Sequence, residues 1–246
     1  KDFGELAVET RMAKGEVDFE EQVINNLTED AKCIYKNLNE KGNDFVKNML
    51  NKFDGESKLS LELTSKDKVY YTDKNGVTRE VAGKTRSPVN NSILISINSS
   101  MANGTSSLGL ARDLLHEIIH ADMFRKLENT NSTGTIEDVD FNDTYNKYKA
   151  EHFNASPDHE TMADLYIDAM STTLKEFHKT VLINDYNKYV QHYGEEPPKE
   201  FYETFAWDGL RNQGVRAWDE LDEEERSIIE DLQLRVGDLT KDCPNE

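Results

Sequence analysis

One stretch of the sequence, Leu114-Leu115-His116-Glu117-Ile118-Ile119-His120-Ala121, combines a helical pattern with metal-binding chemistry. Two imidazoles four residues apart lie on one face of a helix and can bind a single Zn²⁺. Glu117 lies roughly 100° round the helix from His116, near enough for its carboxylate to take a proton from a water that such an ion activates. The stretch therefore predicts a zinc site with His116 and His120 as ligands and Glu117 as the general base.

The residues around this motif predict a buried helix over Leu108–Leu127. Apolar residues occur on nearly every side of it, and Leu114 and Ile118 lie opposite His116. A helix that is apolar all round is buried, and two buried histidines need partners. The alternative is a chance match of a short motif. A chance match can fall anywhere, however, whereas this one lies midway along the strongest helical pattern of the chain.

A catalytic zinc ion also needs a third protein ligand and an open position for water. The short metzincin layout is excluded, because Met123 stands where Gly is required and Lys126 where His is required. The later segment Pro157–Tyr166 offers His159 and Glu160. His159 shares a face with the apolar stripe of its helix, whereas Glu160 lies on the shoulder that turns toward solvent. We therefore favour His159 and keep Glu160 as the alternative.

Tyr166 follows His159 by two helical turns and is expected on the same face. Its hydroxyl could donate to the oxyanion that develops in peptide hydrolysis, so Tyr166 is a second candidate catalytic residue; a plain core position is the alternative. Carboxylates that could orient a ligating imidazole, or that could simply be solvated charges, occur at Asp113, Asp122, Asp158 and Asp164.

The composition restricts the partners of this 246-residue chain, in which 48 Asp and Glu face 29 Lys and Arg, a formal charge of −19. A chain this acidic is repelled by phosphate backbones and anionic lipid, so neither nucleic acid nor a membrane surface is expected as a partner. No Lys/Arg cluster that would build a basic patch stands out, and no apolar run approaches the roughly 18 residues that span a bilayer. The expected partner is a peptide or protein substrate; the oligomeric state stays open.

Cys33 and Cys243 are the only cysteines, which excludes a disulfide scaffold, a zinc ribbon and an iron–sulfur site. The two either pair and tie the C-terminal tail to the first helix, or are both free thiols; both readings stay open. The sequence begins at Lys1 without Met, so we expect a processed chain or a fragment.

The hydrophobic periods predict an α+β protein that forms a single domain over residues 1–246, with helices and a small sheet in 28–107 and metal-site and C-terminal helices in 108–246. Residues 1–27 are expected as a helix or an extended arm, and most of 128–156 as a loop. The other expected elements are helices over 28–53 interrupted at 41–43, strands at 59–63 and 93–97, a hairpin at 69–81 around Asn75-Gly76, a helix from Ser156-Pro157 to about 178, a short helix around 145–148, and helices near 199–211 and 222–235.

The two metal segments, Leu110–Ala121 and Asp158–Ile167, resemble those of bacterial zincin-like metallopeptidases related to the SprT-like group, some of which are terminal modules of larger exported or surface proteins. Asp30–Tyr35 and Phe205–Leu210 are also similar, so the resemblance touches most of the chain, although only the metal segments are specific. It implies a zincin-like α+β fold, in which a small mixed sheet packs on the active-site helix and a mainly helical part follows. It also implies zinc held by His116, His120 and His159, with Glu117 as the general base.

The resemblance further implies a hydrolase that cleaves peptide bonds and is secreted or at the cell surface; a cytoplasmic location stays open. SprT proteins of the DNA-repair kind carry basic or zinc-ribbon DNA-binding parts, which this acidic, Cys-poor chain lacks, so action on DNA-bound proteins is not implied. In zincins an edge strand precedes the metal helix and pairs with the substrate backbone, and Ile93–Ile97 is expected to be that strand. The alternative function is a non-catalytic binding or effector module of a larger exported protein.

Overall fold

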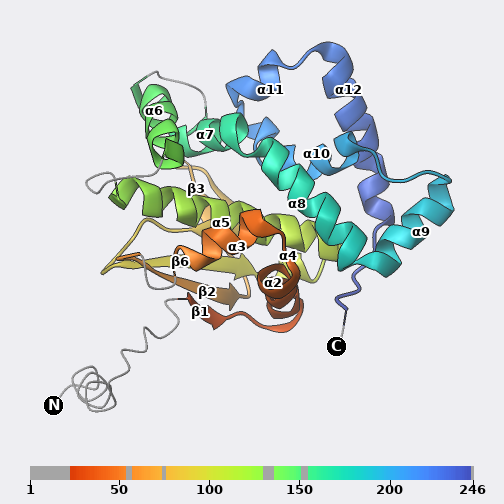
Figure 1. The fold of residues 1–246 in the computed structure, drawn as a ribbon, viewed down its shortest axis with the longest axis horizontal. Helices are drawn as coiled ribbons and strands as arrows, with labels where there is room; N and C mark the ends of the chain where they lie inside the picture. Colours follow the sequence, from red (N-terminus) through yellow and green to blue (C-terminus); the bar gives the residue numbers. More distant parts are fainter. Residues whose placement is uncertain (1–22, 54–56, 74–75, 130–135, 151–154, 245–246) are drawn as a thin grey trace.

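A small sheet packs against the helix that carries the histidine motif, and further helices surround that helix (Figure 1). The computed structural model describes residues 23–53, 57–73, 76–129, 136–150 and 155–244. The chain is thus a mixed α+β protein, which confirms the predicted fold class in outline. The expectation for residues 1–22 lies outside the described residues.

The sheet consists of β1 (Val23–Asn26), β2 (Ser60–Lys66), β6 (Ser92–Asn98) and β5 (Gly83–Thr85), in that spatial order. β1, β2 and β6 are parallel, whereas β5 runs antiparallel to β6. Side chains alternate between the two faces of a strand. On the face toward the helices the sheet buries five aliphatic side chains, which belong to Leu61, Leu63, Ile93, Ile95 and Ile97.

The edge strands of this sheet are β1 and β5, and β5 is the one that contacts α5, so the prediction that Ile93–Ile97 forms the edge was wrong. β6 is paired on both sides, with β2 and with β5. The sequence of β5, Gly83-Lys84-Thr85, contains no apolar residue, so a hydrophobic period could not mark it as a strand. Gly83–Thr85 therefore forms the sheet edge next to the metal-motif helix, where we expected Ile93–Ile97.

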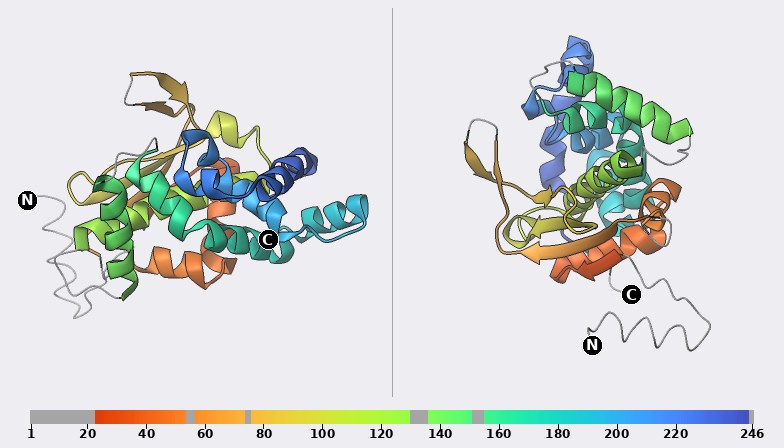
Figure 2. Two further views of the ribbon diagram at one scale, coloured as in Figure 1. Left: turned by 90° about the horizontal axis from the view of Figure 1, so that it is seen from above. Right: turned by 90° about the vertical axis from the view of Figure 1, so that its left-hand side faces the viewer.

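The predicted hairpin over residues 69–81 is confirmed and forms a separate two-stranded unit of β3 (Tyr70–Thr72) and β4 (Thr78–Glu80). Gly76 has φ +81° in the turn, a conformation that favours glycine, while Asn75 lies outside the described residues. The hairpin projects away from the rest of the molecule (Figure 2).

The helix predicted over Leu108–Leu127 is α5 (Ser107–Asn129), and the hydroxyl of Ser106 accepts a hydrogen bond from the Gly109 amide at its start. The side chains on both sides of the histidine motif are fully buried, as an all-round apolar helix requires; they belong to Leu114, Leu115, Ile118 and Ile119. The preceding helices are confirmed as well, since α2 (Glu29–Lys41) and α3 (Asp44–Asn51) flank the predicted interruption. The short α4 (Ser99–Ala102), which follows β6, was not predicted, because we expected a loop over residues 99–107.

Two expectations for the segments after α5 were wrong. Residues 136–150 form a helix, α6 (Ile136–Ala150), where a loop with only a short helical piece was expected. Its composition is poor in helix formers, but Phe141 and Tyr148 are almost fully buried, so tertiary packing outweighs propensity. The helix that begins at Pro157 is broken into α7 (Pro157–Leu165) and α8 (Ile167–Thr180), because Tyr166 leaves helical geometry at φ −122°.

The C-terminal part is helical, as predicted near residues 199–211 and 222–235. It contains α9 (Ile183–Tyr193), α10 (Lys199–Trp207), α11 (Arg216–Glu220) and α12 (Glu223–Leu232), with 3₁₀ turns η1 (Arg211–Gln213) and η2 (Gln233–Asp238). α10 packs between α8 and α12 and also contacts α5. One hydrophobic cluster joins the sheet to these helices. Among the described residues, every helix is too short or too polar to cross a bilayer.

The C-terminal tail is attached to the rest of the fold by a disulfide between Cys33 on α2 and Cys243. Of the two alternatives for these cysteines, a disulfide or two free thiols, the structure shows the disulfide. The tail residue Thr240 accepts a hydrogen bond from the Ser107 amide at the start of α5 and donates to Asp185 on α9. The tail therefore links α2 to the metal-motif helix α5 and to α9.

We expect Cys243→Ser to lower the free energy of unfolding by about 2–5 kcal/mol, because the disulfide closes a long loop and restricts the unfolded chain. Urea denaturation followed by circular dichroism measures the change. Cys33→Ser and the double variant should lose the same amount, since all three remove one bond. Losses that add in the double variant would show that each cysteine contributes independently of the disulfide.

Candidate metal centre

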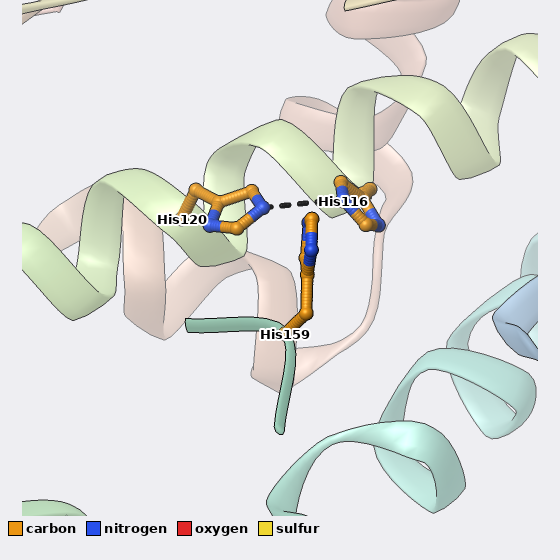
Figure 3. A group of neighbouring side chains, drawn as sticks. All are labelled: His116, His120 and His159. Carbon is orange, nitrogen blue, oxygen red and sulfur yellow. Dashed lines mark hydrogen bonds between the residues drawn. The ribbon is translucent and has the colours of Figure 1, made fainter. Parts of the chain in front are cut away.

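The three histidines predicted as ligands lie together (Figure 3). One possible ligand atom of each of His116, His120 and His159 lies within 4.8 Å of the others. The Nε2 atoms of His116 and His120 are 3.2 Å apart, and the ring of His159 has its centroid 5.7 Å and 5.1 Å from theirs. The structure thus brings all three side chains around one point.

The sequence before α7 explains how His159 reaches this point. Ser156 is the N-cap of α7, and Pro157 follows at the first helical position. The Ser156 hydroxyl accepts a hydrogen bond from the backbone amide of His159, at 3.4 Å. His159 therefore lies in the first turn of a capped helix that packs against α5.

The spacing of the donors fits a zinc ion. Two nitrogens at about 2.0–2.1 Å from one tetrahedral ion are about 3.3 Å apart. The observed Nε2–Nε2 distance of 3.2 Å between His116 and His120 agrees with that value. Nδ1 of His116 is buried and has no hydrogen-bond partner in the described part of the chain. Three imidazoles with one open position are a donor set found in catalytic zinc sites.

Burial also favours the neutral imidazoles that a metal requires. It lowers the pKa of His120 to about 4 and, with a smaller contribution from the ring of His120, that of His159 to about 3. Burial and the two neighbouring rings hold the pKa of His116 well below its ordinary value. At neutral pH each of the three therefore offers an uncharged ring.

Glu160, the alternative third ligand, is directed elsewhere. Its side chain is buried, which corrects the expectation that it turns toward solvent. Its carboxylate accepts a hydrogen bond from the backbone amide of Arg216 at 2.9 Å and so holds the start of α11. These contacts give Glu160 a structural role and leave the position beside the two motif histidines to His159.

The side chain of Glu117, which belongs to the metal-motif helix α5, contacts the edge strand β5. The hydroxyl of Thr85 donates to Oε2 of Glu117 at 2.6 Å. A Cβ on Gly83 would lie 2.7 Å from Cγ of Glu117, so the strand approaches this closely only because residue 83 is glycine. Burial raises the pKa of Glu117 to about 7, and the hydrogen bond from Thr85 partly opposes that rise.

Tyr166, the second candidate catalytic residue, is buried, and its hydroxyl accepts a hydrogen bond from Nζ of Lys126 at 2.9 Å. Lys126 in turn pairs with Asp122 on the same helix. Because α7 ends at Leu165, the common face that we expected for His159 and Tyr166 is interrupted. The contacts favour a structural role for Tyr166, and its catalytic role stays a prediction.

The four candidate carboxylates have other partners. Asp113 pairs with Arg112, Asp122 with Arg125, Asp158 with Tyr145 and Asp164 with Tyr148. In the segments that the structure describes, none of them is hydrogen-bonded to one of the three histidines. The contacts therefore do not support the possibility that these carboxylates orient an imidazole by a hydrogen bond, although the charge of Asp158 partly opposes the fall in the pKa of His159. Solvated charge, the alternative, does not fit Asp113 and Asp122, which are buried.

Further residues lie against the site that the sequence did not assign to it. Arg112, one turn before His116, is hydrogen-bonded to Asp208 in the turn after α10. Gly209 follows with φ +84°, and a Cβ there would lie 4.0 Å from Cε1 of His116. The turn belongs to Phe205–Leu210, a segment of the family resemblance to which no role was attached. For Gly83 and Thr85 no sequence signal existed, since their strand is three residues long.

Comparison of the chain with protein-family models, curated proteins and solved structures gives no match.

For the peptide hydrolysis and the general base that the sequence predicts, Gly83→Ala should lower kcat/KM by about 100-fold, the effect of a catalytic group displaced by about 1 Å. The three atoms nearest to the added methyl group all belong to Glu117, so we expect displacement of that side chain with zinc content at the wild-type value. Steady-state kinetics with metal analysis measures both. Gly237→Ala is the control, because nothing lies within 4 Å of a Cβ at that position. Equal activity of both variants would show that the approach of β5 to Glu117 has no catalytic importance.

Proposed function

We propose that the protein is a zinc-dependent metallopeptidase of zincin-like architecture. The observation that carries the proposal is the convergence of three imidazoles beside a buried carboxylate that touches an edge strand. His116, His120 and His159 would hold the ion. When bound, zinc supplies a water of lowered pKa and polarises the peptide carbonyl.

The edge strand β5 is suited to hold an extended peptide. The amide of Asn98 donates to the carbonyl of Ala82, and the amide of Arg86 donates to the carbonyl of Leu94, so these residues of the β5 segment face β6. Hydrogen-bonding direction alternates along an antiparallel pair, which turns the main-chain groups of Gly83 and Thr85 to the free edge. A substrate backbone that adds to this edge lies next to Glu117.

Glu117 is the proton carrier in this proposal. Its carboxylate accepts a proton from the attacking water and returns it to the leaving amine. Thr85 fixes one carboxylate oxygen, and the contact with Gly83 fixes the side chain, so the base is oriented before the substrate arrives. Thr85 is therefore a positioning residue and Glu117 the catalytic one.

The same proposal includes kinship with the bacterial zincin-like metallopeptidases that the metal segments resemble, and a secreted or cell-surface location. The disulfide between Cys33 and Cys243 supports that location, because such bonds persist in oxidising compartments. The substrate is a peptide or protein, and nucleic acid and membrane are not part of the proposal.

The test is digestion of a broad peptide library by protein loaded with one equivalent of zinc, with the products read by mass spectrometry. We expect cleavage that stops when a chelator removes the metal and returns when zinc is restored. A zinc-loaded protein that cleaves nothing would instead support the alternative, a non-catalytic zincin-like binding or effector module. Cleavage that continues without metal would contradict both.

A further inference from the structure

We propose that Lys84 and Arg86, on the outer face of the edge strand, select acidic side chains at alternate positions of the bound peptide. This inference rests on the proposed function, since it assumes that a peptide adds to the free edge of β5. It assigns a substrate class, peptides with Asp or Glu two residues apart, to a site whose chemistry leaves specificity open.

The strand alternation places these two cations. Gly83 and Thr85 contact Glu117 and are paired with Ile97 and Ile95, whose side chains are buried toward α5. Lys84 is paired with Ser96 and therefore points to the other face. The Arg86 amide donates to the Leu94 carbonyl, so the chain remains extended there and the side chain of Arg86 lies on the same face as Lys84.

A residue directly across from Lys84 in an added strand has its side chain on the same face as Lys84. The same holds for the residue across from Arg86, two positions along. This relation is independent of the direction in which the peptide runs. Two cations on the edge strand therefore face two alternate side chains of the peptide, while the intervening side chains point toward Glu117 and the histidines.

The charges of the neighbourhood indicate which side chains fit. Residues 66–86 contain six basic and three acidic residues, whereas the rest of the chain contains 23 basic and 45 acidic ones. This region therefore carries a local positive charge, which corrects our expectation that the chain has no basic cluster. Two of its cations are already neutralised, Lys68 by Glu80 and Arg79 by Asp73.

Lys84 and Arg86 have no such partner in the part of the chain that the structure describes. Nζ of Lys84 lies 3.3 Å from the carbonyl oxygen of Tyr70 and 5.5 Å from the ring centroid of Tyr71, both on the projecting hairpin. The ammonium group is thus held in place by neutral groups. Neither it nor Arg86, which is exposed, forms an ion pair within the described residues. An immobilised cation without an anion beside a peptide-binding edge favours an acidic side chain on the peptide.

The experiment measures peptide preference in two ways. Cleavage of a library by the zinc-loaded wild type should enrich Asp and Glu at two positions that are two residues apart. Fluorescence anisotropy of labelled peptides with the zinc-loaded Glu117→Gln variant measures the same preference without cleavage. Peptides with Asp at both positions should bind tighter than their Asn counterparts, and added salt should weaken the difference.

Charge reversal assigns the preference to the two residues. In Lys84→Glu the preference at one position should change from acidic to basic, by roughly fivefold in kcat/KM or in Kd, the effect of one opposite-charge cross-strand pair. Arg86→Glu should change the position two residues away. Lys84→Met, which keeps an aliphatic side chain over Tyr71, should lose the preference without reversing it. Lys32→Glu, which reverses an exposed cation on α2, is the control and should leave both preferences as in the wild type.

The outcomes separate this inference from the proposed function. Cleavage or binding with no acidic preference, or a preference that both charge reversals leave intact, would overturn the inference while the peptidase proposal stands. A protein that cleaves nothing, but binds acidic peptides selectively until Lys84→Glu reverses the selectivity, would overturn the peptidase proposal. The same result would support the role of Lys84 and Arg86 in selecting acidic side chains. Absence of both cleavage and peptide binding would overturn both.

Discussion

Replacement of Glu117 by Gln is expected to abolish most peptide cleavage while the protein keeps its zinc. The amide is nearly the same size as the carboxylate and can still contact Gly83 and Thr85, but it cannot accept a proton from water. General base catalysis contributes about 10²–10⁴-fold, so kcat should fall by that factor. Quenched fluorescent peptides identified from the library measure kcat, and metal analysis of the same sample measures zinc content.

Glu128→Gln is the matched control, because it makes the same chemical change at an exposed position near the end of the same helix. It should be as active as the wild type. A Glu117→Gln variant that retains full activity would remove the base from the mechanism. A variant that loses zinc as well as activity would indicate that the carboxylate supports the metal site.

Replacement of His159 by Ala is expected to weaken zinc binding far more than replacement of Glu160. Loss of a group that only orients a ligand costs about 10–100-fold in affinity, so loss of a ligand should cost more than about 100-fold. Competition with a chromophoric chelator gives the zinc dissociation constant. His192→Ala is a control for the removal of an imidazole, since His192 lies in the last turn of α9, far along the chain from the metal motif.

Glu160→Ala should affect stability instead. The carboxylate accepts the Arg216 amide, and loss of a buried partner costs about 1–3 kcal/mol. We expect this loss in urea denaturation, with a zinc dissociation constant close to that of the wild type. The reverse order, weak binding in Glu160→Ala and near-normal binding in His159→Ala, would make Glu160 the ligand and require α7 to rotate.

The candidate site was predictable where helical geometry alone fixes the direction of a side chain. His116 and His120 lie four residues apart on one helix, so their convergence follows from its period. His159 could be chosen over Glu160 because its face carries the apolar stripe of α7. The same rule misjudged Glu160, which is buried because α11 packs on the other side of α7, and no local pattern reports that contact.

The parts of the fold that could not be predicted depend on contacts distant in the sequence. β5 is a strand because it pairs with β6, not because of its own residues, and so Gly83 and Thr85 were not recognised beside Glu117. α6 is held by the burial of Phe141 and Tyr148 against a helical propensity that is low. The pairing of Cys33 with Cys243, which are 210 residues apart, likewise follows only from the path of the tail.

The most direct test of the account is a crystal structure of the zinc-loaded protein with an anomalous difference map at the zinc edge. We expect one strong peak at about 2.0–2.1 Å from a ring nitrogen of each of His116, His120 and His159. A map without a peak there, or with a peak that is bound by other residues while the ring of His159 lies elsewhere, would contradict the proposed metal centre.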